Sequence, residues 1–159
     1  MTRPAGSGLS DGERYEQGMT VRRAVLSDAH VDRSTAAATE LTAEWQDFIT
    51  RVAWGDIWSR PGLDRRSRSI AVLSSLIAHG HHEELAMHLT AALRNGLTVD
   101  EIREVILQSA IYSGVPAANT AFRIASEVFG DAGGSDAAGS DAAGSTGSDS
   151  AGSDEGATR

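Results

Sequence analysis

The sequence predicts an all-α fold, a single helical domain of about six helices, and three observations favour it. Apolar residues recur at spacings of four and three, for example at Leu85, Leu89 and Ala92, which places them on one helix face. Residues 10–13 and 98–101 each have the pattern of a capping box, in which two side chains satisfy backbone N–H groups at a helix start. Alternation of apolar and polar residues with a period of two never persists for more than a few residues, so strands are not expected.

Punctuating residues divide the chain into its expected helices. Gly96 and Gly114 suit helix ends, and Pro116 suits a first helical turn, where a missing N–H costs nothing. The minimal link at Gly80 predicts that the helices on either side form a hairpin. We therefore expect helices over residues 10–27, 42–58, 64–79, 81–95, 98–113 and 116–129.

The last 29 residues differ in composition from the rest. Residues 131–159 contain only Asp, Ala, Gly, Ser, Thr, Glu and one Arg, so they offer no large apolar side chain to offset the entropy lost on ordering. We expect a helical domain over residues 1–130 and a disordered tail over residues 131–159. Six acidic residues against one Arg give the tail −5 of the net charge of −8, which leaves −3 for the body.

Composition also excludes several classes of protein. Neither part of the chain carries the basic stripe that nucleic-acid binding requires. No apolar run approaches the roughly 20 residues of a membrane span, and the polar start lacks a signal core. The chain has no cysteine, which rules out disulfides, thiol nucleophiles and thiolate metal sites. We expect a cytoplasmic protein that binds neither nucleic acid nor a membrane.

The nine residues 80–88, called the histidine segment below, contain three of the five histidines and two carboxylates. If this segment is helical, His81, Glu84 and His88 share one stripe on the border of the apolar face. His82 would then project into that face, and Glu83 away from it. Border positions are partly buried, and partial burial shifts pKa values towards those useful in proton transfer. The segment is therefore the predicted chemical site, except that Glu83 is better explained as a surface carboxylate that matches the helix dipole.

Other polar and aromatic residues support weaker hypotheses. Arginines cluster ahead of the histidine segment, and one of them, Arg66, could bind an anionic ligand with its guanidinium fork. His82 suits a subunit contact or a core hydrogen bond at least as well as a ligand. Three tryptophans are expected to anchor the core or an interface, since large aromatic side chains dominate burial. These are Trp45, Trp54 and Trp58.

The break between the last two expected helices offers a second candidate region. Tyr112, Ser113 and Asn119 flank it, and a helix that starts there could present amide donors to an anion. Ser113 has no visible His and Asp partners for nucleophilic catalysis, so the pattern does not favour a serine hydrolase.

The sequence resembles the carboxymuconolactone decarboxylase family over nearly the whole body and none of the tail. The wider superfamily has the alkylhydroperoxidase-D-like all-α fold, whose redox members carry Cys-x-x-Cys-x-x-x-His at a helix start. In this chain the corresponding frame reads His81-x-x-Glu84-x-x-x-His88. Because both thiols are replaced, peroxide reduction is excluded chemically, whereas proton transfer is retained. The resemblance rests on residues 14–18, 54–58, 60–66, 80–88, 93–98 and 114–129.

The resemblance implies decarboxylation of 4-carboxymuconolactone to β-ketoadipate enol-lactone, a step of protocatechuate catabolism. This lactone dicarboxylate is its own electron sink, so no cofactor and no metal are expected. His81 would donate the proton, Glu84 would raise its pKa and fix its tautomer, and His88 would donate to the enolate oxygen or orient the substrate. The expected substrate-binding residues are His82, Arg66, Tyr112 and Asn119.

Two other classes of function stay open at this point. The chain could be a hydrolase or isomerase of a related lactone, or a helical interaction module without activity. A two-histidine, one-carboxylate metal site on the stripe is conceivable, but a reaction with a built-in electron sink does not need it. Relatives with this fold form trimers or hexamers, so we also expect a homo-oligomer, in particular a hexamer.

Overall fold

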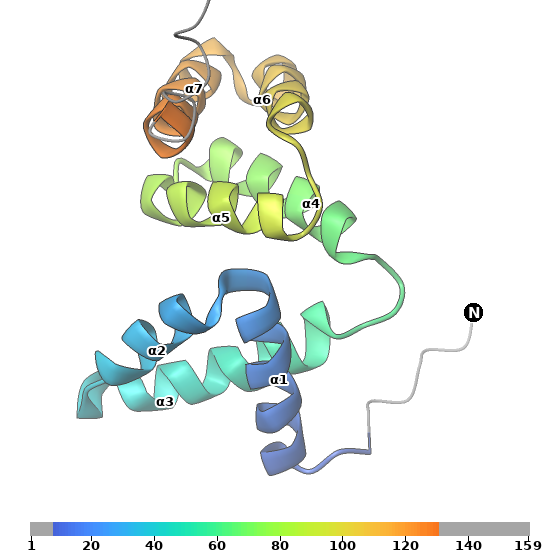
Figure 1. Cartoon of the computed structure of the whole chain (residues 1–159), viewed down its shortest axis with the longest axis vertical. Coiled ribbons are helices and arrows are strands. Elements are labelled where there is room, and N and C mark those ends of the chain that lie inside the picture. The colour runs from blue at the N-terminus through green and yellow to red at the C-terminus, as the bar shows by residue number, and fades with distance from the viewer. Residues whose placement is uncertain (1–7, 131–159) are drawn as a thin grey trace, which may run out of the picture.

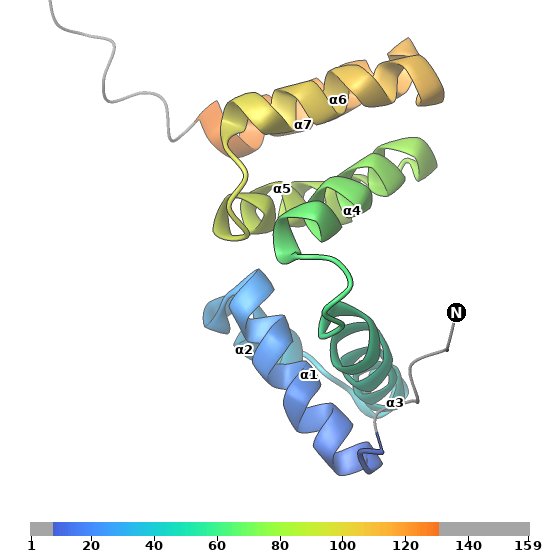
Figure 2. The ribbon, with the colours of Figure 1, turned by 90° about the vertical axis from the view of Figure 1, so that its right-hand side faces the viewer.

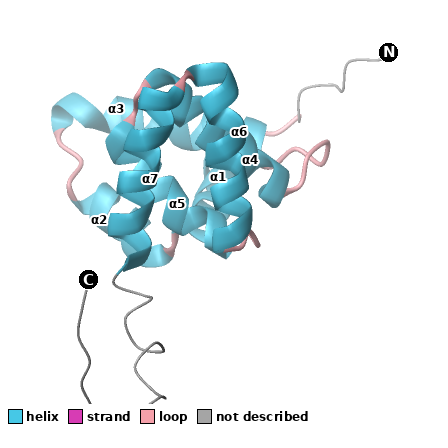
Figure 3. Cartoon of the chain, turned by 90° about the horizontal axis from the view of Figure 1, so that it is seen from above, coloured by secondary structure: helices cyan, strands magenta, loops and turns pink. Residues whose placement is uncertain are grey.

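The computed structural model describes residues 8–130, and the expected tail at residues 131–159 lies outside them. Within the described range every regular element is a helix (Figure 3), which confirms the predicted fold class. In chain order the elements are α1 (Asp11–Leu26), α2 (Asp28–Ala36), α3 (Glu40–Ile49), the π-helix η1 (Thr50–Trp58), α4 (Arg65–His79), α5 (His82–Arg94), α6 (Val99–Ser113) and α7 (Val115–Gly130).

The helices form stacked layers (Figure 1). Helices α1, α2 and α3 lie with η1 in one layer, α4 and α5 form the middle of the molecule, and α6 and α7 cover the far side. The hairpin predicted at Gly80 is present, because this residue has the left-handed φ of 69° that lets α5 return along α4. Figure 2 shows the α4–α5 turn and the α6–α7 turn at the same end of the molecule.

Helix α5 contributes to two separate cores. Leu85 and Leu89 are fully buried against α4, α6 and α7. Ala91 belongs to the second core, which α1, α2 and η1 share, and Met87 packs against it. At about 100° per residue these two sets lie on different faces of the helix, so α5 holds the layers together. Any side chain on its second face lies at the junction between the layers.

Helix α2 is an addition to the helices expected from the sequence. The chain turns sharply at Ser27, whose φ of 90° is uncommon for a residue other than glycine, and a new helix starts at once. The Ser27 hydroxyl then accepts a hydrogen bond from the backbone N–H of His30 at 3.3 Å, which caps α2. This turn lets Val31 of α2 enter the core that Ala91 of α5 shares, and His30 beside it is half-buried.

The expected helix over residues 42–58 exists, but its second half is a π-helix. The chain runs from α3 into η1 without a break. The backbone hydrogen bonds change from the α-helical pattern to the i→i+5 pattern over Thr50–Trp58. Such wide turns are rare and are found mostly where a protein has a functional need for them.

Two glycines allow α1 to cross η1 in close contact. A Cβ atom placed on Gly18 would lie 2.1 Å from the carbonyl oxygen of Thr50, and one on Gly55 would lie 2.5 Å from that of Arg14. Both distances are far inside van der Waals contact, so a side chain at either position would force the helices apart. The pairing of Arg14 with Asp56 spans the same crossing.

We predict that Gly18→Ala destabilises the protein by about 2–4 kcal/mol, because its methyl group must displace backbone rather than a flexible side chain. Gly12→Ala is the matched control on the same helix. A Cβ there meets nothing within 4 Å, so this change should be neutral or stabilise by up to about 1 kcal/mol. Urea unfolding of both variants checks the prediction, and equal midpoints would contradict it.

Candidate active site between the helical layers

The structure alters the predicted histidine stripe at its first member. His81 is the N-cap of α5, with φ −83° and ψ 80°, and therefore lies outside the helix. Its carbonyl accepts the first helical hydrogen bond, from Leu85 N–H at 2.9 Å. His81 and Glu84 are both exposed, and His82 is exposed as well, so its expected place in the apolar face was wrong. The sharp return of the chain after Gly80 explains this, since the helix cannot begin until the turn is complete.

Glu84 and His88 remain on one face of α5, one turn apart. His88 is half-buried and stacks on Trp58 of η1, with 6.5 Å between ring centroids and 18° between ring planes. The pKa of His88 is lowered to about 4, chiefly by burial and also by the charge of His30, while the Glu84 carboxylate acts in the opposite direction. At neutral pH His88 is therefore an uncharged imidazole that can donate one hydrogen bond and accept another.

His30 is the main residue that the sequence analysis missed. It is half-buried on α2, its Nε2 lies 3.4 Å from the Ser34 hydroxyl, and its charge acts on His88 across the layer junction. Burial lowers the pKa of His30, and the charges of Arg33 and Arg22 lower it further. The available signal was Ser27 followed directly by Asp28, since serine is a favoured N-cap and an acidic residue suits the first helical turn, although no glycine marks the turn.

Arg66 lies away from this junction. It donates a hydrogen bond to the Gly96 carbonyl at 2.9 Å and forms an ion pair with Glu101, tying the start of α4 to the start of α6. The Arg66 guanidinium, followed by the Thr98 backbone N–H, lowers the pKa of the Glu101 carboxyl to about 2. Because Arg66 lies in the first turn of α4 and the turn at Gly80 ends the helix, about 20 Å of helix separate Arg66 from His81. Its substrate-binding role stays a prediction that the geometry does not favour.

Tyr112 and Asn119 lie near the α6–α7 turn. Both are exposed, and Tyr112 retains 80% of its accessible surface. The elements that carry them meet at the same end as the α4–α5 turn (Figure 2), where His81 and His82 also lie. The candidate residues thus form two groups: an exposed group at this end, and a half-buried group at the layer junction.

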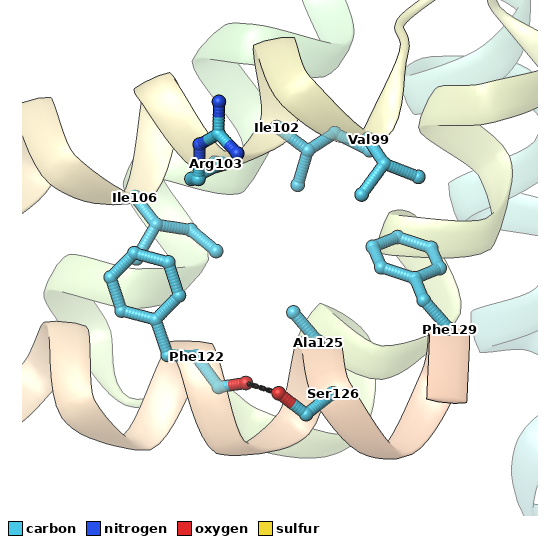
Figure 4. A pocket seen from close by; sticks show the side chains of 8 residues that line it. All are labelled: Val99, Ile102, Arg103, Ile106, Phe122, Ala125, Ser126 and Phe129. Atoms are coloured by element: carbon cyan, nitrogen blue, oxygen red, sulfur yellow. Dashed lines mark hydrogen bonds between the residues drawn. The ribbon is translucent and has the colours of Figure 1, made fainter. Parts of the chain in front are cut away.

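A groove of about 210 Å³ between α6 and α7 lies apart from both groups (Figure 4). Its walls are mainly apolar, with Ile106 and Phe122 at one side, Val99 and Phe129 at the other, and Arg103 at the rim. None of the predicted site residues lines it. Its lining offers no group for acid–base chemistry.

Two kinds of feature are absent from the part of the chain that the structure describes. Over residues 8–130, no three His, Asp or Glu side chains are grouped so that they could hold a metal ion, so Glu84 and the histidines do not form such a set. In the same range, no helix is both long enough and apolar enough to cross a membrane.

The described chain is all-helical, and α5 carries the half-buried His88 one turn from the exposed Glu84, two residue types that enzymes use for acid–base chemistry. Residues 43–127 match the model of the carboxymuconolactone decarboxylase family, and the chain belongs to this family. It is 46% identical over 125 residues to a 4-carboxymuconolactone decarboxylase of Acinetobacter baylyi, covering 79% of this chain and 93% of that protein. It is also 38% identical over 117 residues to a nitrosuccinic acid decarboxylase of Metarhizium robertsii, covering 74% of this chain and 82% of the relative.

The lowered pKa of His88 predicts a loss of stability in mild acid. Between about pH 6.5 and pH 4 the unfolded chain binds a proton at this imidazole that the folded chain does not, so stability is complete above this range and falls as the pH drops through it. We expect His88 to contribute up to about 3 kcal/mol of this loss. Urea unfolding from pH 7 to pH 4 gives the free energies of unfolding of wild type and His88→Gln. The amount by which wild type exceeds the variant should fall as the pH drops. A difference that does not change with pH would contradict the burial of an uncharged His88.

Proposed function

We propose that this chain decarboxylates 4-carboxymuconolactone without a cofactor and yields β-ketoadipate enol-lactone, as a step of protocatechuate catabolism. The observation that carries the proposal is the 46% identity to a 4-carboxymuconolactone decarboxylase over 93% of that protein. The second relative is also named as a decarboxylase, which favours loss of CO2 over lactone hydrolysis or isomerisation. The cytoplasmic location expected from the sequence belongs to the same proposal.

The reaction needs proton transfer and charge stabilisation from the protein. The bond between the ring carbon and its carboxylate breaks, CO2 leaves, and the electron pair moves through the ring double bond to the lactone carbonyl oxygen. A proton must then reach the carbon next to that carbonyl. The protein contributes a donor for the developing oxyanion, a proton donor, and contacts that hold the dicarboxylate in place.

His88, Glu84 and His81 are the residues proposed for these roles. The uncharged imidazole of His88 is suited to donate a hydrogen bond to the developing oxyanion, since Trp58 fixes its ring and burial removes competing water. Glu84 lies between the two histidines along α5 and orients the site. His81 is exposed at the helix start and remains the proposed proton donor.

Incubating the purified chain with enzymatically generated 4-carboxymuconolactone tests the activity directly. We expect one CO2 released for each substrate consumed, with enol-lactone as the product detected by ultraviolet absorbance and mass spectrometry. A lactone hydrolase or an isomerase would consume the substrate without CO2, and an interaction module would leave it unchanged. Either result would refute the proposed decarboxylation.

The acid–base roles predict a specific pattern of kcat among α5 variants. His81→Ala and Glu84→Gln should each lower kcat by about 10²–10⁴-fold, the usual scale of general acid–base catalysis. Glu83→Gln, the adjacent and equally exposed carboxylate, should change kcat much less. The double variant should lose less than the product of the single losses. If His81→Ala keeps more than about a third of wild-type kcat, the proton donor is another histidine. Circular dichroism of each variant is the control for folding.

We also propose a homo-oligomer, a trimer or a hexamer, with the hexamer as the expected form. Large apolar side chains remain exposed on two separate surfaces: Leu41, Trp45 and Phe48 along α3, and Ile111, Tyr112 and Val115 at the α6–α7 turn. Surfaces of this kind usually mark contacts between chains. Light scattering at micromolar concentration should give a multiple of the 16.7 kDa chain mass, and a monomer mass would contradict the proposal.

A further inference from the structure

Arg22 is a buried arginine without a carboxylate partner in the described part of the chain. Only 5% of its surface is exposed. Its guanidinium donates to the Thr50 hydroxyl at 3.2 Å and to the Gln46 side-chain oxygen at 3.1 Å, and its Nε has no acceptor. Burying an arginine costs free energy that two neutral acceptors do not return. The neighbouring Arg23 shows the usual alternative, since it is more exposed and pairs with Asp28 and Asp32.

The helix that carries Arg22 packs at the layer junction: Val25 and Leu26, one turn further along α1, share the second core with Val31 of α2, Trp54 of η1 and Ala91 of α5. The charges of Arg33 and Arg22 both act on His30, and the charge of His30 in turn acts on His88. Glu84 is the one acid whose charge acts on His88. Four of these groups, on α1, α2 and α5, carry or can accept positive charge, and only one, Glu84, is a carboxylate. Such a field attracts an anion and strengthens the binding of one.

We propose that the junction of α1, α2, α5 and η1, formed by His30, His88 and Trp58 and backed by Arg22, is a carboxylate-binding site for the lactone substrate. The His30 imidazole provides an N–H donor, the indole of Trp58 provides a flat apolar wall for the lactone ring, and Arg22 provides the fixed positive charge, while the one N–H of the uncharged His88 faces the developing oxyanion. The inference rests on the proposed function and adds to it the residues that recognise the anion.

The site binds the carboxylate that stays on the lactone rather than the one that leaves as CO2. A guanidinium close to the departing carboxylate would stabilise charge that disappears in the transition state and would therefore slow the reaction. Held at the carboxymethyl group, the same charge stabilises substrate and transition state equally and orients the ring. Loss of Arg22 should consequently raise KM more than it lowers kcat.

A binding experiment that needs no catalysis tests this site. The probe is (5-oxooxolan-2-yl)acetate, a saturated lactone that keeps the carboxymethyl group and lacks the departing carboxylate, and its methyl ester is the neutral reference. By calorimetry, wild-type protein should bind the acid at least about 10-fold more tightly than the ester, the scale of a charge-assisted hydrogen bond. In Arg22→Met and in His30→Gln this preference should fall to about twofold or less.

The neighbouring arginine provides the matched control. Arg23→Met should keep the wild-type preference and lose some thermal stability, because it removes two ion pairs. Arg22→Met should keep or raise Tm, because it replaces a buried unpaired charge with an apolar chain of similar length. Retention of the acid preference in a folded Arg22→Met or His30→Gln variant would overturn the proposal, and His30→Gln decides if Arg22→Met does not fold. Because the probe loses no CO2, failure of the decarboxylation assay is a separate result.

Discussion

Helix α1 lies directly on η1 because neither Gly18 nor Gly55 carries a Cβ atom at the crossing. The remaining architecture of the first layer follows from this contact. It fixes the direction of α1, and after the turn at Ser27 α2 places Val31 in the core that Ala91 of α5 shares. It also fixes η1, which presents Trp58 to the imidazole of His88. The close approach of the two helices at these glycines thus positions the residues that meet at the junction.

The second requirement is that α5 serves two cores at once. One face carries large aliphatic residues that bind it to α4, α6 and α7, and the other face combines small apolar residues with Glu84 and His88. His88 can lie between the layers, with Glu84 exposed one turn away, because the aliphatic face alone supplies enough burial to hold the helix. Burial of the imidazole then follows from its position in the stack, and its lowered pKa follows from that burial.

The sequence was most informative where the physical signal is local. Capping boxes at residues 10–13 and 98–101 and the glycine at position 80 depend on neighbouring residues alone, and the structure contains all three. The start of α2 could not be found in this way, because a serine rarely adopts the positive φ that Ser27 has. His81 was assigned to a helix because periodicity cannot resolve the last residue of a turn from the first residue of a helix.

Contacts between distant parts of the chain were beyond the reach of sequence patterns. Arg66 reads as a free cation in an arginine cluster, yet its partners Gly96 and Glu101 lie 30 and 35 positions away. Arg22 reads as half of an ordinary Arg-Arg pair, and only the packing of α1 against η1 shows that one member is buried and the other is not. The family resemblance identified the reaction, whereas the residues that surround the site could be identified only from the fold.

The stack of Trp58 on His88 gives the junction an optical signal of its own. An indole face attracts a cation, so the electronic environment of Trp58 differs according to whether the imidazole beside it is charged. The other two tryptophans occupy different environments, Trp45 largely in solvent and Trp54 within the core, and neither stacks on a titratable ring in the described structure. The intrinsic fluorescence of the protein therefore contains one component that reports on the protonation and occupancy of the junction, without any label.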